Sequence, residues 1–395
     1  MLIIMNKIKK VGIVVMFRMD SGGGAPRVVI DLIKSLEYFG YKVHLLTPWK
    51  LDYKKIAEIF EPIKIEKEYN VKNYKLRFCV EKNLSRKLMK KEFVEMAENV
   101  DLIIDIDGGI LHKYLPENKK YIIWRISGID SELEKTGFRY KNWKIKVKRF
   151  IKKTITPSEN TLSKNHKIYA VDEWTKNLMI DKWELLNTQK LCLYPEIKTD
   201  HFSYIPEIKK NQAIILGRIS PNKRIDESIK VFALGAKNSK YNLVIIGGVT
   251  PDSENYIEHL ENIAKEQGIE NRVNFIGNPS FNKLKEKVEE SKILIECQRD
   301  ISLTMTSIEC LAAGVVVLVH KNGGTFKEVL DNGKYGVGFE SIEEASEKLK
   351  KIIGALEIKK ISPENFIKRT EFFSGKKFRE RLRKIIEIEE MNNYS

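Results

Sequence analysis

The chain has 395 residues, which is long for one ordinary domain and comfortable for two. Its 42% hydrophobic and 31% charged residues are typical of a folded, water-soluble protein and exclude a disordered one. The net charge of +16 indicates an anionic partner, with nucleic acid, an acidic membrane and phosphorylated substrates all open. A lysine- and isoleucine-rich composition that reflects the source organism's base usage or growth temperature is an equally good explanation.

No apolar stretch reaches the roughly 18 residues that a membrane-spanning helix needs. The N-terminus lacks the apolar core of a signal peptide, so the sequence predicts a cytoplasmic protein. The four cysteines and six histidines show neither a disulfide pattern nor metal-ligand spacing. No metal and no cofactor is therefore predicted.

The first fifty residues predict a strand, a glycine loop, a helix and a second strand. Residues 11–17 and 43–46 are apolar runs, and apolar positions recur at helical spacing over 25–39. This order is the building unit of a parallel, doubly wound sheet. Further strands are predicted at 102–106, 121–126 and 154–156.

A second series of strands begins at residue 213, after a polar connection over 199–210. The fold class is therefore α/β, with two facing Rossmann-like doubly wound domains, residues 1–203 and 204–367. The charged, amphipathic stretch 368–395 predicts a C-terminal helix that packs back on the N-terminal domain. The predicted elements of the second half are strands at 213–216, 243–246, 273–276, 293–295 and 315–319, and helices at 255–267, 282–290 and 305–313.

Three glycines, Gly22, Gly23 and Gly24, join the first predicted strand to the first helix. Glycine leaves backbone amides open to a ligand at the positive end of a helix, so Gly23 and Gly24 are candidates for binding phosphate or sugar. The run does not match the dinucleotide fingerprint, because no third glycine follows at the required spacing. A plain tight turn is the alternative interpretation.

Two cations follow the first strand of the second half. Arg218 can form two parallel hydrogen bonds with a diphosphate, and Lys223 can add a point charge. Solvated loop charges are the alternative interpretation.

The segment from Thr304 to Gly314 indicates a helix N-terminus that leads to a buried strand. Open amides at Thr304, Met305 and Thr306 would bind phosphate oxygens. Glu309 lies on a helix face of otherwise small and apolar residues, where a carboxylate needs partners such as ribose hydroxyls. An exposed helical glutamate is the alternative.

Taken together, these segments resemble the retaining glycosyltransferases of family 4, which have the GT-B fold. Residues 309–314 and the spacing from Gly324 to Glu328 resemble the mannosyltransferases that extend lipid-linked oligosaccharides. The resemblance implies that Arg218 and Lys223 neutralise the donor diphosphate without a metal, and that Glu309 holds the ribose. It rests on residues 22–29, 155–158, 194–202, 217–223, 244–248, 274–277, 309–314 and 322–329.

The sequence departs from this family eight residues before Glu309, where Ile301 replaces the usual second glutamate. Asp300 lies next to it, and a one-residue bulge that brings Asp300 to the sugar hydroxyls is the favoured interpretation. Asp300 is therefore predicted to be catalytic, together with Arg218 and Lys223. A differently held donor sugar and weak catalysis are the alternatives.

The N-terminal domain departs from the family at Ser127, where a histidine is expected. Basic and aromatic residues over 138–153 suit either an anionic membrane surface or an ordinary amphipathic helix, so peripheral contact with the inner membrane face stays open. A second basic stretch, 72–91, falls where relatives bind the acceptor.

The resemblance implies transfer of a hexose from GDP-mannose or a UDP-sugar to a hydroxyl acceptor such as a glycan or lipid-linked glycan. A sugar-nucleotide-binding protein with little or no turnover is the alternative, because Ile301 and Ser127 replace expected polar residues. Nucleic acid is not an expected partner, since no DNA- or RNA-binding signature accompanies the charge.

Overall fold

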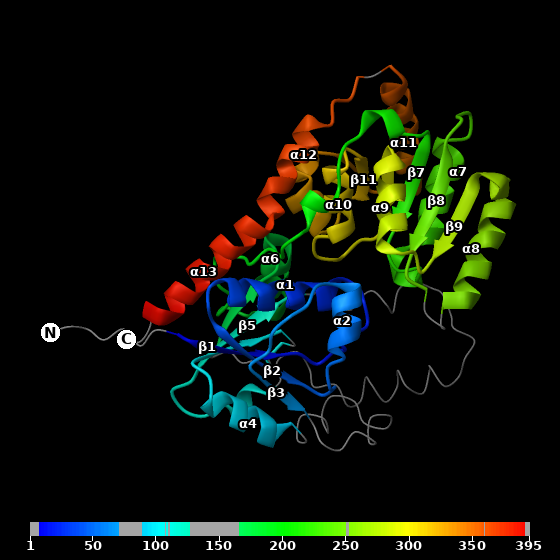
Figure 1. Ribbon diagram of the computed structural model, residues 1–395. Coiled ribbons are helices and arrows are strands. Elements are labelled where there is room, and N and C mark those ends of the chain that lie inside the picture. The colour runs from blue at the N-terminus through cyan, green and yellow to red at the C-terminus, as the bar shows by residue number, and fades with distance from the viewer. Residues whose placement is uncertain are drawn as a thin grey trace. The chain divides into compact units, whose positions relative to one another are not determined.

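The computed structural model describes residues 8–70, 89–106, 108–109, 111–126, 166–249, 253–358 and 360–391. The chain divides into two compact units (Figure 1). The described part of the first unit extends to Glu196 and resumes at Phe378, and that of the second is Ile197–Lys377. The sequence predicts boundaries at 203 and 368. The N–H of Ile197 donates to the carbonyl of Phe373 at 2.9 Å. This bond joins the beginning of the second unit to a residue near its end.

Six parallel strands form the sheet of the first unit, in the order β3-β2-β1-β4-β5-β6. Ile13 of the buried strand β1 lies opposite Leu45 on one side and Ile104 on the other. The chain order reverses between β1 and β4, which makes their carboxyl ends the switch point of this sheet. The strands are β1 (Lys10–Val14), β2 (Lys42–Thr47), β3 (Lys67–Asn70), β4 (Leu102–Asp105), β5 (Lys120–Arg125) and β6 (Lys167–Ala170).

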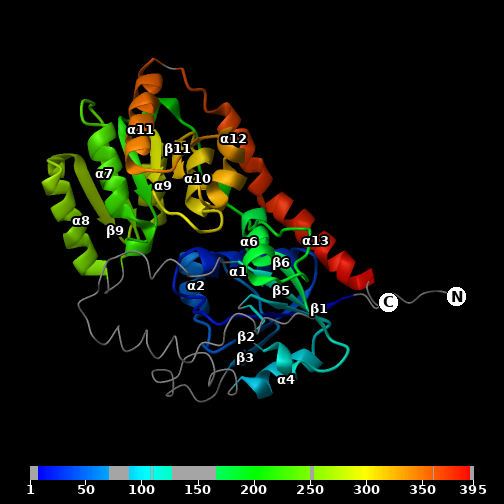
Figure 2. The same cartoon turned by 180° about the vertical axis from the view of Figure 1, so that it is seen from behind.

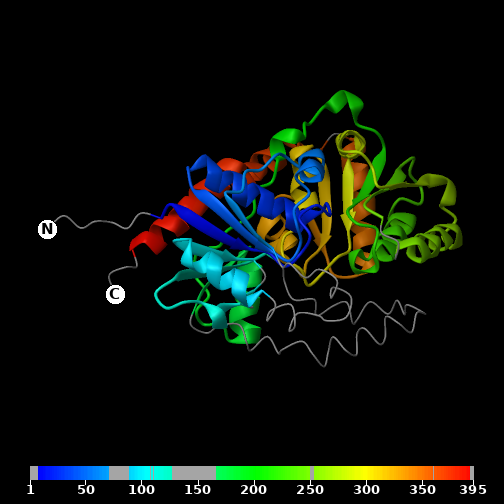
Figure 3. The same ribbon diagram turned by 60° about the horizontal axis from the view of Figure 1, so that its bottom comes forward.

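Helices cover this sheet, with α4 packed against β2 and β3 (Figure 3). Helix α1 follows the glycine loop and buries one apolar face, including Val29, Ile33 and Leu36. The helical elements are α1 (Gly24–Tyr38), α2 (Tyr53–Ile59), α4 (Lys90–Glu98), the 3-10 turn η2 (His112–Tyr114) and α6 (Glu173–Trp183).

The C-terminal stretch is not the single helix that the sequence predicts from residue 368. Ser374 adopts an extended conformation, with ψ 159°, and separates the 3-10 turn η11 (Glu371–Phe373) from helix α13 (Gly375–Met391). Helix α13 packs on the first unit: the ring of its Phe378 stacks on Trp124 with centroids 5.8 Å apart. Its apolar face, with Leu382, Ile385 and Ile386, is buried.

The second unit repeats the same topology, with parallel strands in the order β12-β11-β10-β7-β8-β9. Here the chain order reverses between β7 and β10. The strands are β7 (Gln212–Leu216), β8 (Asn242–Gly247), β9 (Val273–Gly277), β10 (Ile293–Glu296), β11 (Val316–His320) and β12 (Val337–Phe339). Two doubly wound parallel sheets confirm the predicted α/β fold class.

Helices α7, α8 and α11 pack together over one face of this sheet (Figure 2). Phe232, Leu260 and Leu349 from these three helices share one apolar core with Ile215 and Ile295 from the strands. Helix α10 packs against both α9 and α12. The remaining elements are η4 (Thr199–His201), η5 (Pro206–Ile208), η6 (Pro221–Lys223), α7 (Ile225–Gly235), α8 (Glu254–Glu266), η8 (Glu270–Arg272), α9 (Phe281–Glu290), α10 (Met305–Ala312), the π-helical turn η9 (Thr325–Val329), η10 (Asp331–Gly333), α11 (Ile342–Glu357) and α12 (Glu364–Thr370).

The sequence patterns predict the central strands and miss β3, β6 and β12, which are short strands at the sheet edges. The strand predicted at 154–156 lies outside the described residues. Over the described ranges, no helix combines the length and apolar character needed to cross a membrane.

Candidate donor-binding site

The loop after β7 is held close to the end of β8 by backbone hydrogen bonds. The N–H of Gly217 donates to the carbonyl of Ile246 at 3.1 Å, and that of Ile219 to Gly248 at 2.9 Å. Gly247 permits this close approach, because a Cβ atom there would lie only 1.7 Å from the carbonyl oxygen of Gly217. The loop therefore leaves the sheet at a fixed angle, beside the switch point of the second unit.

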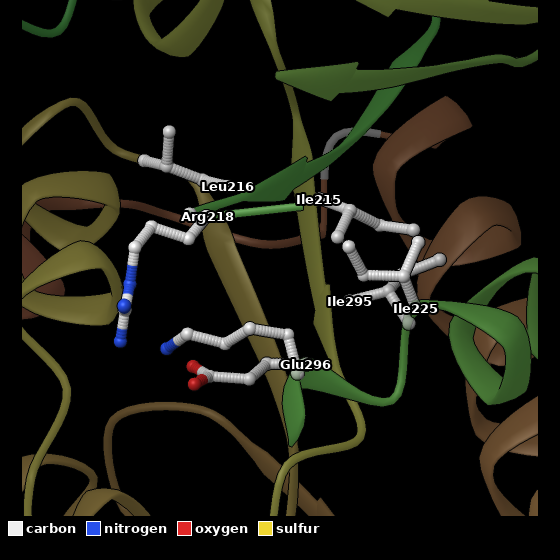
Figure 4. A pocket seen from close by; sticks show the side chains of 8 residues that line it. Ile215, Leu216, Arg218, Ile225, Ile295 and Glu296 are labelled. Atoms are coloured by element: carbon white, nitrogen blue, oxygen red, sulfur yellow. The ribbon is translucent and has the colours of Figure 1, made fainter. Parts of the chain in front are cut away.

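Arg218 and Lys223, both predicted from the sequence, line one pocket with the end of β10 (Figure 4). Figure 4 shows the side chains of Arg218 and Glu296 reaching into the same space. The Arg218 side chain is exposed, whereas that of Lys223 is partly buried. The lining residues are Ile215, Leu216, Gly217, Arg218, Lys223, Ile225, Ile295 and Glu296.

The ammonium of Lys223 donates a hydrogen bond to Oε1 of Gln298 at 2.7 Å. Burial lowers the pKa of Lys223 below its ordinary value; the positive charge of Arg218 acts in the same direction and the negative charge of Glu296 opposes it. The pocket holds two cations and one carboxylate, so it keeps an excess of positive charge that an entering anion would neutralise. The pocket is thus suited to a phosphate-bearing ligand.

The next cation in this loop, Arg224, has a different role. It adopts a left-handed conformation with φ 50° before α7, and its guanidinium contacts the carboxylate of Glu227 at 2.6 Å. Glu227 also accepts a hydrogen bond from Arg299 at 3.2 Å. This pairing holds the start of α7 to the segment after β10. Arg224 thus has a structural role and, unlike Arg218 and Lys223, does not line the pocket.

Thr304, the N-cap residue of α10, does not cap its own helix with its side chain. Its hydroxyl donates to Oε2 of Glu296 at 2.9 Å, and the Ser307 hydroxyl donates to the same oxygen at 2.7 Å. The backbone N–H of Thr304 donates to the Thr325 hydroxyl at 3.0 Å. Glu296 thereby connects the pocket to the first turn of α10, where the predicted residues Met305 and Thr306 lie.

Glu309 is buried in α10, with only 5% of its surface exposed, so the exposed-glutamate alternative is wrong. The same helix buries Cys310, and desolvation raises the pKa of that thiol well above its ordinary value, with a further contribution from Glu309. Helix α10 ends at Ala312, and the N–H of Gly314 just beyond it donates to the carbonyl of Leu311 at 3.0 Å. Glu309 thus sits on a packed, fixed helix, although its predicted contact with ribose stays a prediction.

Asp300 adopts a left-handed backbone conformation, with φ 56°. Its N–H donates to the carbonyl of Asn322 at 2.9 Å, and its Oδ1 accepts from the Asn322 side-chain amide at 2.5 Å. The N–H of Gly324 in turn donates to the carbonyl of Ile301 at 2.8 Å. These bonds hold the segment of Asp300, between β10 and α10, against the loop after β11. Asp300 is not among the residues that line the pocket.

The catalytic role of Asp300 stays a prediction, and a carboxylate that does line the pocket is that of Glu296, which was not predicted from the sequence. It terminates β10 directly after the apolar residues Ile293, Leu294 and Ile295. A charged residue at the carboxyl end of a buried strand beside the switch point is the signal that could have identified it.

The two other predicted site residues, Gly23 and Gly24, lie in the first unit, at the start of α1. Gly23 has φ 102°, a conformation that favours glycine, and a Cβ atom there would meet no heavy atom within 4 Å. The loop is therefore open on that side, as a ligand-binding loop requires. Ser127 and the stretch 138–153 lie outside the described residues, as does most of 72–91.

No group of three or more histidine, cysteine, aspartate or glutamate side chains among the described residues could hold a metal ion.

Residues 196–371 match the family model described as glycosyl transferases group 1. The matched residues cover nearly all of the described second unit, which is therefore similar in sequence to glycosyl transferases group 1. This unit contains the pocket, the loop after β7 and helix α10. This match confirms the resemblance to glycosyltransferases found in the sequence.

Two curated relatives extend the comparison beyond the family model. A mouse GDP-Man:Man(3)GlcNAc(2)-PP-Dol alpha-1,2-mannosyltransferase is 29% identical over 163 residues, which are 38% of this chain and 33% of the relative. The match thus spans about a third of the relative's length. An uncharacterized glycosyltransferase of Haemophilus influenzae is 25% identical over 83% of this chain and 85% of its own. The narrower likeness to lipid-linked-oligosaccharide mannosyltransferases is therefore confirmed for part of the chain.

Solved structures resemble this chain over nearly its full length. A glycosyltransferase from Rickettsia africae aligns with a TM-score of 0.69 and 17% identity over 98% of this chain and 100% of its own. Anabaena HepE, solved in complex with UDP and glucose, aligns with a TM-score of 0.68 and 14% identity over 96% and 99% of the two chains. These likenesses confirm the GT-B fold class.

Proposed function

We propose that the protein is a retaining glycosyltransferase that moves a hexose from a nucleoside-diphosphate sugar to a hydroxyl acceptor. One observation carries the proposal: Arg218 and Lys223 line one pocket at the switch point of a unit similar in sequence to glycosyl transferases group 1. Ligands of doubly wound sheets bind outside the carboxyl ends of the strands at this point. A guanidinium and an ammonium together are suited to the two phosphates of such a donor.

The donor candidates come from the relatives. The mouse relative's name includes GDP-mannose as GDP-Man, and HepE is solved with UDP and glucose. We therefore propose GDP-mannose or a UDP-sugar as the donor. A glycan or lipid-linked glycan is the proposed acceptor, since the name of the same mouse relative gives Man(3)GlcNAc(2)-PP-Dol as its acceptor.

The chemistry that these residues would perform is stabilisation of the leaving group. As the bond between the sugar and the diphosphate breaks, negative charge accumulates on the phosphate oxygens. Arg218 and Lys223 would hold that charge in a partly desolvated pocket, where electrostatic stabilisation is stronger than in water. The resemblance implies that no metal is required, a prediction that activity in excess EDTA tests directly.

A donor screen tests the proposal. The purified protein is titrated calorimetrically with UDP-, GDP- and ADP-sugars, and release of the nucleoside diphosphate is followed with and without glycan acceptors. We expect one donor to bind and be consumed, and Arg218→Ala to weaken binding. Lys283→Ala is the matched control, because Lys283 is an exposed cation on α9 paired with Glu286.

Each outcome has a distinct meaning. The anomeric configuration of the product, read by NMR, tests retention, and inversion would reject that part of the proposal. Donor binding with neither hydrolysis nor transfer would favour a sugar-nucleotide-binding protein instead. Failure of the folded protein to bind any donor would reject both.

A further inference from the structure

Glu296 places a carboxylate in the same pocket as two cations, and its two oxygens have different surroundings. Oε2 accepts the hydroxyls of Thr304 at 2.9 Å and Ser307 at 2.7 Å. No hydrogen bond or ion pair from the part of the chain that the structure describes reaches Oε1. One oxygen is thus fixed by the protein, and the other remains available to a ligand.

The two hydroxyls come from the first turn of α10 and hold the Glu296 side chain in one orientation. The Thr304 hydroxyl is itself within 3.0 Å of both the Ser307 and Thr325 hydroxyls. Thr304 and Ser307 are buried, with 6% and 0% exposure. A carboxylate anchored in this way is preorganised to accept a further hydrogen bond with defined geometry.

An ionised carboxylate accepts hydrogen bonds and donates none, so its partner in the ligand must carry O–H or N–H groups. Phosphate oxygens bound by Arg218 and Lys223 would repel it. In a nucleoside-diphosphate sugar the transferred sugar is bonded directly to the terminal phosphate, so its hydroxyls lie beside the diphosphate. They are the donors that a carboxylate in this pocket would meet.

We propose that Glu296 is a specificity-determining residue whose Oε1 accepts a hydrogen bond from a hydroxyl of the donor's transferred sugar. This inference rests on the proposed function. It assigns to Glu296 the contact with the sugar that the sequence analysis gave to Asp300, whose Oδ1 already accepts from Asn322.

Paired ligands test this assignment. The affinities of wild type, Glu296→Ala and Glu296→Gln are measured calorimetrically for UDP and UDP-glucose, and for GDP and GDP-mannose. We expect Glu296→Ala to weaken binding of the sugar nucleotide about 10-fold while the sugar-free diphosphate binds as well or better, since a charged hydrogen bond is lost and a repulsion is removed. Glu296→Gln retains an acceptor oxygen and should lose about 3-fold. Glu286→Ala, an exposed carboxylate on α9, is the control.

Donors that lack one sugar hydroxyl at a time locate the contact. For one of these donors, the affinity of wild type should fall to the affinity that Glu296→Ala has for the complete donor. Glu296→Ala should bind that deoxy donor and the complete donor equally well. The inference would be overturned if Glu296→Ala lost equal affinity for the diphosphate and the sugar nucleotide, or lost none. It would also be overturned if removal of a ribose hydroxyl, and not of a hydroxyl of the transferred sugar, reproduced the loss. Glu296→Gln and a thermal melt separate these results from misfolding. If wild type binds no nucleoside diphosphate, the proposed function fails as well; if it binds, only this assignment is at stake.

Discussion

The ammonium of Lys223 and the side-chain oxygen of Gln298 lie 2.7 Å apart, which connects the loop after β7 to the segment after β10 across the switch point. This bond fixes one of the two pocket cations. We expect Lys223→Met to weaken nucleoside-diphosphate binding by about 10- to 100-fold, because a charge-assisted contact is lost. Gln298→Leu leaves the charge of Lys223 in place but removes the acceptor that orients its ammonium, so a loss of about 3-fold in affinity is expected. Calorimetry measures both, and a larger loss for Gln298→Leu would contradict this order.

Diphosphate binding should depend on pH through Lys223. Burial lowers the pKa of this ammonium, so the empty pocket loses the charge at lower pH than an ordinary lysine would. Affinity should therefore fall from its value at neutral pH as pH rises toward 10. Lys223→Arg remains charged throughout and should flatten the profile between pH 7 and 10. Parallel profiles for the two proteins would show that another group titrates.

Gly247 should be required for the local fold of the site. A Cβ atom at this position would lie 1.7 Å from the Gly217 carbonyl oxygen, so Gly247→Ala must separate the β7 loop from β8. We expect a loss of about 3 kcal/mol in the free energy of unfolding, together with weaker donor binding. At Gly248 the nearest atom is Cγ of Arg218 at 3.7 Å, an ordinary contact. Gly248→Ala is the matched control, and urea denaturation that ranks the two variants equally would contradict the argument.

Glu389 should anchor helix α13 to the first unit. Its carboxylate accepts from Lys167 Nζ at 2.9 Å and from the Tyr169 hydroxyl at 3.2 Å, and it is 5% exposed. Glu389→Ala leaves both donors without this acceptor, and we expect destabilisation of about 2 kcal/mol, reduced by the partial exposure of Lys167. Glu387→Ala breaks an exposed pair with Arg383 on the same helix and should cost less than about 0.5 kcal/mol. Thermal melting of both variants decides the comparison.

Lys209 should make stability depend on pH in the alkaline range. Its ammonium donates to the carbonyls of Ser291 and Ala313, both at 2.7 Å, and burial lowers its pKa from 10.5 to about 8. Between these values the unfolded chain binds the proton and the folded chain does not, so the free energy of unfolding gains a contribution that rises with pH. Lys209→Met lacks this contribution. The free energy of unfolding of wild type, measured relative to that of Lys209→Met, should therefore be larger at pH 10 than at pH 7. An equal difference at the two pH values would contradict the assignment.

Much of the fold could be predicted from the sequence, because buried parallel strands are continuous apolar runs. The runs at β1, β8 and β11 indicate strands without any knowledge of their neighbours. Edge strands β3 and β12 give no such signal, since each pairs on one side only and is short. The C-terminal helix pattern could be predicted as well, whereas its interruption at Ser374 could not.

By itself, the sequence determined the two doubly wound halves, the Arg218–Lys223 loop and the resemblance to glycosyltransferases, because these depend on local patterns of apolar residues, glycine and charge. Only the tertiary structure placed Glu296 in the pocket and Asp300 against Asn322. Both placements depend on side chains from segments far apart in the chain: the ends of strands β7 and β10 meet only after the sheet has formed, and hydroxyls from α10 then orient the carboxylate. A contact made across a switch point has no spacing along the chain from which it could be recognised.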